Sequence, residues 1–217
     1  MYPEKIMGDY KAQMLKTLKQ NLKARCHLVK PQPIDGEKSL NAAVLVVLCG
    51  DDDDLELLLT VRSEHVNRHR GEVAFPGGMW QGGDDSLLDT ALREAEEEVG
   101  VRESSLELLA TLQSSSPLQN HITVAPFIAY MTREQKLIAQ PSEISQIFRV
   151  PIQYLMNKRN YCYFKKNFDG KSLSLPHIDY NEHRIWGFTL KVLVDLLNIG
   201  LDAEIHLCFP FKTHNTN

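Results

Sequence analysis

Residues 86–100 read SLLDTALREAEEEVG and form the most regular helical pattern in the chain. Ser86 with Asp89 three positions later is typical of a helix N-cap, and Gly100 predicts the C-terminal end. With about 100° per residue, the apolar side chains fall on one stripe that would be buried against a sheet. This stripe consists of Leu88, Ala91, Leu92, Ala95 and Val99. The stretch therefore predicts an amphipathic helix over about residues 86–99.

The same helix places Glu94, Glu97 and Glu98 on one contiguous face, with Arg93 close enough to pair with Glu97. Like charges four residues apart cost about 0.2–0.5 kcal/mol per pair, and acids in the last turns oppose the helix dipole. A divalent cation would relieve both penalties, and oxygen-only ligands favour Mg²⁺ or Mn²⁺. The alternative is an acidic, solvated helix face. Glu96 lies on a different side, and we expect it to be an ordinary surface residue.

Outward from this helix, the apolar patterns predict a mixed β-sheet with helices on its faces, an α/β fold. The expected strands are residues 41–49, 55–62, 72–75, 106–112, 122–130, 144–150, 161–168 and 173–180. Further helices are expected over about residues 9–25, from Pro151, and over about 185–199. The last of these is apolar on more than one face, which indicates either deep burial or a homodimer interface.

The composition is that of a soluble globular protein, because 43% of the 217 residues are hydrophobic and 24% are charged. A formal net charge of −4 argues against a nucleic acid partner. The longest apolar run, Ala42–Cys49, is too short to span a membrane. The four cysteines form no CxxC pair, and the N-terminus lacks a secretion signal, so we expect a cytoplasmic location.

A glycine turn at Pro76-Gly77-Gly78 precedes the acidic helix. Glycine backbone can approach a ligand closely, so Gly77 and Gly78 are candidates for binding phosphate groups, although an ordinary turn would look the same. The chain contains neither the GxxxxGK[ST] nor the GxGxxG phosphate motif, and no HExxH zinc motif.

These residues resemble the Nudix family of diphosphate hydrolases. Residues 93–101, REAEEEVGV, match the second half of the Nudix box, REUxEExGU with U aliphatic, at every fixed position. In the full box, Gx5Ex7REUxEExGU, counting forward from Gly78 reaches Asp84 and counting back from Arg93 reaches Asp85. The loop is thus one residue longer, and either Asp84 or Asp85 replaces the usual glutamate.

Two upstream segments look like the signature of the coenzyme A diphosphatase branch: Leu58–Ser63, LLTVRS, and Gly71–Gly78, GEVAFPGG. The similarity extends over about residues 42–197. It implies a Nudix fold, an α/β/α sandwich, with residues 1–40 as a helix and linker packed on the domain, 41–200 as the hydrolase domain and 201–217 as a tail. The sequence departs from the branch at Asn67, Met79 and Gln81, near the place where substrate would enter.

The resemblance implies that water attacks a diphosphate held by divalent ions. Glu94, Glu97 and Glu98 would bind Mg²⁺ or Mn²⁺, and Arg93 would position the glutamates rather than touch substrate. The general base is expected to be Glu98, or else a carboxylate on a later loop. Glu143 is placed for that role, although a plain surface position is the stronger expectation for it.

The expected substrate is coenzyme A, cut to phosphopantetheine and adenosine 3′,5′-bisphosphate. Its 3′-phosphate needs a cation, and Arg62 is the first candidate because it lies in the branch signature; Arg68, His69 and Arg70 are others. Two alternatives stay open. The first is the same chemistry on a dinucleotide, ADP-ribose or a nucleotide sugar. The second is a non-catalytic nucleotide-binding module, which the presence of all three glutamates disfavours.

Overall fold

The computed structural model describes residues 13–34, 40–52, 54–66, 69–117, 122–168 and 170–209. Its centre is a seven-stranded sheet with the order β3-β2-β1-β6-β5, to which β4 adds beside β1 and β7 beside β2. These strands are β1 (Leu40–Cys49), β2 (Glu56–Arg62), β3 (Val73–Ala74), β4 (Gly77–Met79), β5 (Leu106–Thr111), β6 (Thr123–Met131) and β7 (Ile144–Pro151). β1 and β6 pair in parallel, and the other pairs are antiparallel, so the sheet is mixed.

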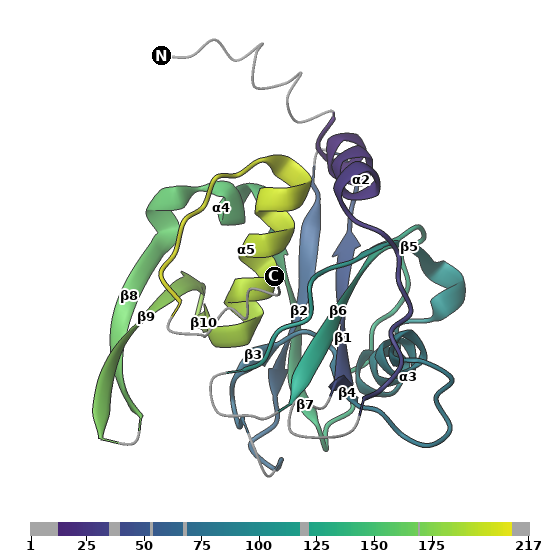
Figure 1. Cartoon of the computed structure of the whole chain (residues 1–217), viewed down its shortest axis with the longest axis horizontal. Helices are drawn as coiled ribbons and strands as arrows, with labels where there is room; N and C mark the ends of the chain where they lie inside the picture. Colours follow the sequence, from purple (N-terminus) through teal and green to yellow (C-terminus); the bar gives the residue numbers. More distant parts are fainter. Residues whose placement is uncertain are drawn as a thin grey trace.

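Helices cover both faces of this sheet (Figure 1). Helix α3 (Leu87–Val99) packs on β1 and β4, and its apolar stripe closes one core with side chains such as Leu45 and Phe127. Helices α2 (Met14–Arg25) and α5 (Gly187–Leu201) close a second core on the opposite face. The α/β/α arrangement predicted from the sequence is confirmed.

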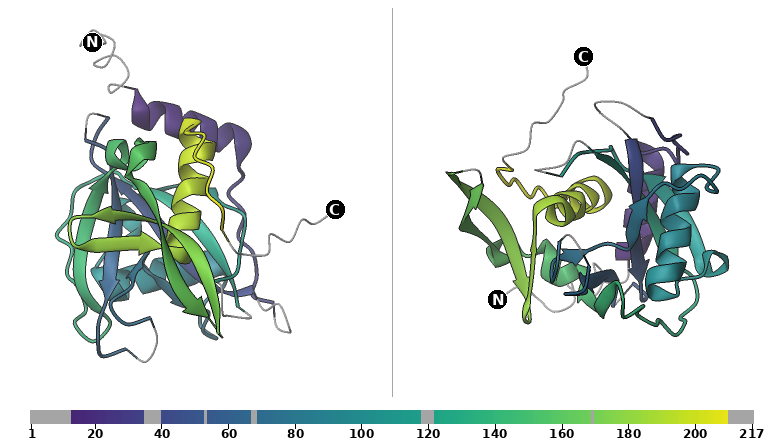
Figure 2. Two further views of the ribbon diagram at one scale, coloured as in Figure 1. Left: turned by 90° about the vertical axis from the view of Figure 1, so that its left-hand side faces the viewer. Right: turned by 90° about the horizontal axis from the view of Figure 1, so that it is seen from below.

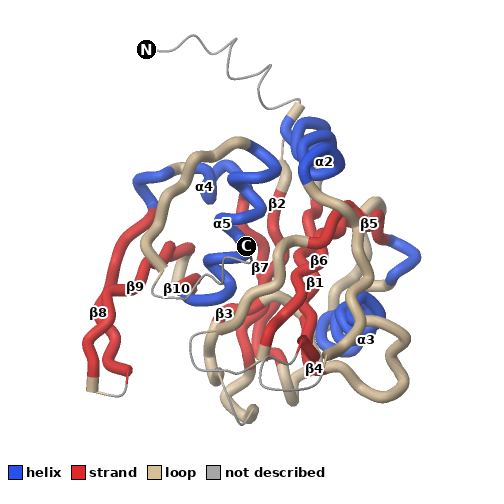
Figure 3. The backbone as a smooth tube through the Cα atoms, viewed as in Figure 1, coloured by secondary structure: helices blue, strands red, loops and turns tan. Residues whose placement is uncertain are grey.

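A second sheet of three strands, β10-β9-β8, stands beside α5. Its strands are β8 (Tyr161–Phe168), β9 (Lys171–Tyr180) and β10 (His183–Trp186), and the short helix α4 (Ile152–Met156) leads into it. The view from below in Figure 2 shows α5 between the two sheets, and Figure 3 shows β8 and β9 as one long hairpin. The predicted hairpin is confirmed, because all of β8 pairs with residues Lys171 to Ile178 of β9; Asp169 of its turn lies outside the described residues.

Two local predictions were wrong. Residues 76–78 do not form a tight turn; Gly77 and Gly78 belong to strand β4 and pair with Val44 and Ala43 of β1. The last helix begins at Gly187 rather than at residue 185, because Ile185 and its neighbours pair with β9 as strand β10. The partner of β4 is a strand far earlier in the chain, whereas β10 pairs with β9, the strand directly before it.

The terminal segments that are described pack on the domain. Leu18 and Leu22 of α2 are fully buried, and Leu18 Cγ lies only 3.1 Å from the place where a Cβ on Gly200 of α5 would stand. After α5, Ala203 and Ile205 are buried in the same core. Burial within one chain therefore accounts for the several apolar faces of α5. In the described part of the chain, no helix combines the length and the hydropathy that a membrane crossing requires.

Candidate active site

Helix α3 positions two glutamates because its ends are fixed as the sequence predicts. Ser86 Oγ accepts a hydrogen bond from the Asp89 backbone N–H, and Gly100 ends the helix in the left-handed conformation with φ of 75°. Glu94 and Glu98 lie one turn apart at the edge of the buried stripe, and their exposed fractions are 9% and 2%. The helix therefore holds two carboxylates in a nearly water-free position, where ionisation is costly unless a cation is near.

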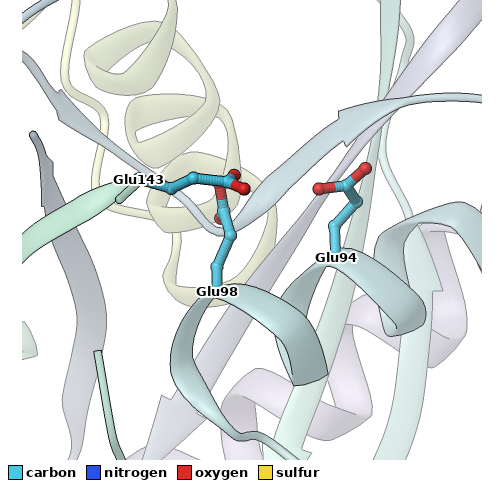
Figure 4. Close-up of side chains that lie close together, drawn as sticks. All are labelled: Glu94, Glu98 and Glu143. Carbon is cyan, nitrogen blue, oxygen red and sulfur yellow. The ribbon is translucent and has the colours of Figure 1, made fainter. Parts of the chain in front are cut away.

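A third carboxylate joins them from the segment before β7. Carboxylate oxygens of Glu94, Glu98 and Glu143, one from each residue, all lie within 4.8 Å of one another. Figure 4 shows Glu94 and Glu98 rising from one helix and Glu143 reaching toward Glu98 from a neighbouring segment. Two backbone hydrogen bonds place Glu143: Gln140 N–H donates to Glu98 O at 2.9 Å, and Ser63 N–H donates to Glu143 O at 2.7 Å. Glu143 is exposed, as expected, but its carboxylate belongs to the cluster.

Burial is the main cause of the shifted pKa values in the cluster. Desolvation raises the pKa of Glu98 to about 7, and Glu94 and Glu143 add to this rise. Two neighbours lower the pKa of Glu98. Gly77 N–H donates a hydrogen bond to Glu98 Oε2 at 3.0 Å, and Nη1 of Arg62 lies 3.6 Å from Oε1. Burial is also the main cause that raises the pKa of Glu94. Glu94 and Glu98 are thus held where burial disfavours their charged forms.

This donor set fits a hard divalent cation. All its candidate ligands are carboxylate oxygens, which Mg²⁺ and Mn²⁺ prefer, and neither sulfur nor nitrogen ligands join the cluster among the described residues. A bound cation would offset the mutual repulsion that burial magnifies. Glu94, Glu98 and Glu143 are thus the residues that would hold it.

Glu97, the third expected metal ligand, lies differently. Its side chain is 60% exposed, and its Oε2 accepts a hydrogen bond from Arg93 Nη1 at 3.1 Å. The pairing of Arg93 with Glu97 at i,i+4 is therefore confirmed. Glu97 does not belong to the group of three close carboxylates that the described residues form, so its role as a metal ligand stays a prediction.

Arg93 donates hydrogen bonds to several acceptors next to the cluster. Its Nη1 also donates to Glu94 Oε1 at 2.9 Å, and its Nη2 donates to the carbonyl of Met79 at 3.3 Å. Its Nε and Nη2 donate to the two oxygens of Asp84 at 2.9 and 3.1 Å. With these acceptors engaged, the guanidinium orients Glu94 and Glu97, as expected for a positioning residue.

Asp84, rather than Asp85, is the acid of this loop that pairs with Arg93. Its carboxylate accepts hydrogen bonds from Arg93, from Thr90 Oγ1 at 2.8 Å and from the Gln81 N–H at 3.1 Å. These bonds, that from Arg93 first, lower the pKa of Asp84 to about 2. Asp85 is exposed on the surface of the loop. In this loop, which is one residue longer than usual, Asp84 is therefore paired with Arg93.

The two glycines of β4 are required by close contacts. A Cβ on Gly77, where φ is 156°, would lie 2.3 Å from the backbone oxygen of Ala43. A Cβ on Gly78 would lie 2.5 Å from the Glu94 carboxylate. Gly77 therefore permits the strand pairing and Gly78 leaves room for the carboxylate; phosphate binding by these two glycines stays a prediction.

A cleft of about 710 Å³ opens in front of this region. Arg62, Gly77 and Gly78, the three expected substrate-binding residues, all line it. Its opposite wall is formed by Lys166 and Phe168 of β8, Trp186 of β10 and Phe188 of α5. Sequence reasoning did not single out this wall. Arg70 of the expected cationic loop donates from its Nε to the Val66 carbonyl, and Asn67 and Arg68 lie outside the described residues.

Comparisons with known proteins agree with this geometry. The family model described as NUDIX domain matches residues 39–168. Nudix hydrolase 3 from Caenorhabditis elegans is 32% identical over 215 residues, which cover 91% of this chain and 87% of that protein. A Yersinia enterocolitica protein named "Uncharacterized Nudix hydrolase NudL" is 34% identical over 177 residues, 78% of this chain and 87% of that protein.

Among solved structures, a MutT/nudix family protein from Enterococcus faecalis is similar with a TM-score of 0.53 and 20% identity, over 79% of this chain and 66% of that one. This likeness supports the fold. The chain belongs to the Nudix family and is a Nudix hydrolase. The predicted box and enzyme class are therefore confirmed.

Proposed function

We propose that the enzyme hydrolyses the diphosphate of coenzyme A or its derivatives to phosphopantetheine and adenosine 3′,5′-bisphosphate. The observation that carries this proposal is the position of the two segments that resemble the coenzyme A diphosphatase branch. Arg62, from the first segment, and residues Glu72 to Phe75, Gly77 and Gly78, from the second, all line the cleft. The residues that distinguish the branch thus lie where substrate would contact them.

In this proposal the diphosphate lies at the Gly77–Gly78 end of the cleft. The chemistry supplied by bound Mg²⁺ or Mn²⁺ is neutralisation of the diphosphate charge and acidification of the attacking water. Glu94, Glu98 and Glu143 hold the cation, and Arg93 keeps Glu94 oriented through its 2.9 Å contact. Arg62, the side chain of which is 27% exposed, faces the cleft from the end of β2 and can bind a phosphate oxygen.

Glu98 is our candidate for the general base, with Glu143 as the second candidate. Burial raises the pKa of Glu98 to about 7, and a bound cation would lower it again, so in the loaded enzyme Glu98 would be ionised and able to accept a proton. Glu143 is exposed and lies in the same cluster, so it can accept a proton and release it to solvent. The reaction needs one proton removed from water as the P–O–P bridge breaks.

The test is a turnover assay with coenzyme A, acyl-coenzyme A, NADH and ADP-ribose in the presence of Mg²⁺ or Mn²⁺, with products identified by mass. We expect adenosine 3′,5′-bisphosphate as a product and the highest kcat/KM with the coenzyme A substrates. The Glu98→Gln variant should lose nearly all activity and the Glu96→Gln variant little. Efficient turnover of NADH or ADP-ribose with none of coenzyme A would overturn the substrate assignment.

A second candidate is the same hydrolysis of another nucleoside diphosphate derivative, such as a dinucleotide. The observation in its favour is Met79, which stands where the branch has a lysine and which lines the cleft with 43% of its surface exposed. An apolar side chain there removes one cation from the substrate entrance. The same assay separates the two candidates.

A further inference from the structure

The wall of the cleft opposite the carboxylate cluster combines aromatic rings with one cation. The Nζ of Lys166 lies 3.9 Å from the centroid of the Trp186 ring and 5.5 Å from that of Phe168. Phe188, in the first turn of α5, lines the cleft beside them. Apolar rings that hold an ammonium group in a cleft keep it partly desolvated, and this strengthens its attraction to an anion.

Lys166 differs from the other cationic side chains that line the cleft. Arg62 has Glu98 at 3.6 Å, and His69 Nδ1 lies 2.8 Å from Glu72 Oε2. Among the described residues, no carboxylate lies within ion-pair distance of Lys166. Its charge is therefore available to a ligand, whereas the charge of Arg62 is partly neutralised by Glu98 and the His69 ring is already in contact with Glu72.

We propose that this wall binds the 3′-phosphoadenosine part of the substrate, with Lys166 paired to the 3′-phosphate and the adenine ring against Phe168, Trp186 and Phe188. This inference rests on the proposed function. A nucleobase stacks on aromatic rings, and a phosphate pairs with an ammonium group, so the wall offers both kinds of contact together. It assigns the 3′-phosphate to Lys166 instead of Arg62, which faces the carboxylate cluster.

The test compares coenzyme A with dephospho-coenzyme A, which lacks only the 3′-phosphate. In the Lys166→Met variant we expect kcat/KM for coenzyme A to fall about tenfold or more, mainly through KM, with dephospho-coenzyme A nearly unaffected. Lys166→Arg should restore most of the preference. Lys165→Met is the matched control, because Lys165 is exposed and its side chain points to the other face of β8.

A binding measurement keeps the inference separate from catalysis. In a Trp80→Phe background Trp186 is the only tryptophan left, so its fluorescence reports binding at this wall. We expect adenosine 3′,5′-bisphosphate to bind about tenfold more tightly than adenosine 5′-phosphate, and Lys166→Met to remove the difference.

The outcomes separate the two proposals. If the wild-type enzyme does not hydrolyse coenzyme A, the proposed function fails, and the binding measurement decides the nucleotide site alone. If coenzyme A is hydrolysed but Lys166→Met leaves its preference over dephospho-coenzyme A unchanged, the assignment of Lys166 is overturned. An equal loss for both substrates would also overturn it, because Lys166 would then contact a group that the two share.

Discussion

Arg93 and Asp84 meet through two parallel hydrogen bonds, Nε to Oδ1 at 2.9 Å and Nη2 to Oδ2 at 3.1 Å. The pair joins the loop after β4 to α3 and leaves Nη1 of the same guanidinium for Glu94 and Glu97. The loop acid therefore influences the carboxylate cluster without belonging to it.

The first prediction concerns this pair. Replacing Asp84 by asparagine removes the charge that holds Arg93, so Glu94 loses its fixed orientation. We expect kcat to fall about 10–100-fold, the usual effect of losing a residue that orients a metal ligand. Steady-state kinetics of Asp84→Asn measure this effect. Asp85→Asn is the matched control and should behave like the wild type; an equal loss in both would mean that the loop charge as a whole matters.

The same pair predicts an acid-dependent stability. The pKa of Asp84 falls from 3.8 to about 2 on folding, chiefly because of Arg93. Its contribution is therefore fully present above pH about 4 and decreases as the pH falls toward about 2. Denaturant unfolding of wild type and Asp84→Asn should show a gap in unfolding free energy at pH 6 that narrows steadily below pH 4. A gap that stays constant with pH would exclude an ionic origin.

The two glycines of β4 should separate stability from activity. In Gly77→Ala the new Cβ meets the backbone of β1, which cannot yield, so we expect a lower unfolding temperature and poor folding. In Gly78→Ala the nearest atoms to the new Cβ belong to the Glu94 carboxylate, a side chain rather than backbone, so the fold should persist while activity and metal affinity decrease. Gly82→Ala, with nothing within 4 Å of the new Cβ, is the control. Calorimetry and a metal titration on each variant measure these effects.

Metal binding should stabilise the protein through the clustered glutamates. At a cation concentration of about 100 Kd, the wild type should gain roughly 2.7 kcal/mol, or about 5 °C or more in Tm. Glu98→Gln and Glu143→Gln should reduce this gain, and Glu96→Gln should leave it intact. Glu97→Gln decides the open assignment of that residue: a full gain would show that Glu97 does not bind the ion. Thermal unfolding with and without Mg²⁺ or Mn²⁺ gives the answer.

The sequence predicts α3 well because the signals for this helix are local. Its cap, its stop and its apolar stripe lie within residues 86–100, and so does the pairing of Arg93 with Glu97. Local signals do not place Glu143 in the cluster, because its position depends on a backbone bond from Gln140 to Glu98 and on one to Glu143 from Ser63, 80 positions earlier in the chain.

The two wrong predictions, at β4 and at the start of the last helix, both fall on residues that pair as strands. β4 and β10 are strands only because β1 and β9 lie beside them, and neither has a strong pattern of its own. The aromatic wall of the cleft joins residues of β8 with Trp186 of β10 and Phe188 of α5, and nothing in their spacing indicates that they meet. The sequence therefore predicts elements whose signals are local, whereas contacts between distant segments are seen only in the folded structure.

The aromatic wall of the cleft and the carboxylate cluster, which adjoins the cleft through Arg62 and Gly77, belong to two different sheets. The cation-binding side chains stand on the main sheet and its helix, whereas the hairpin of β8 and β9 belongs to a second sheet with its own hydrogen bonds. Side chains near the hairpin tip can therefore be exchanged without disturbing the bond-breaking machinery. A related enzyme could acquire a different substrate preference by altering this hairpin alone, and an engineer could do the same.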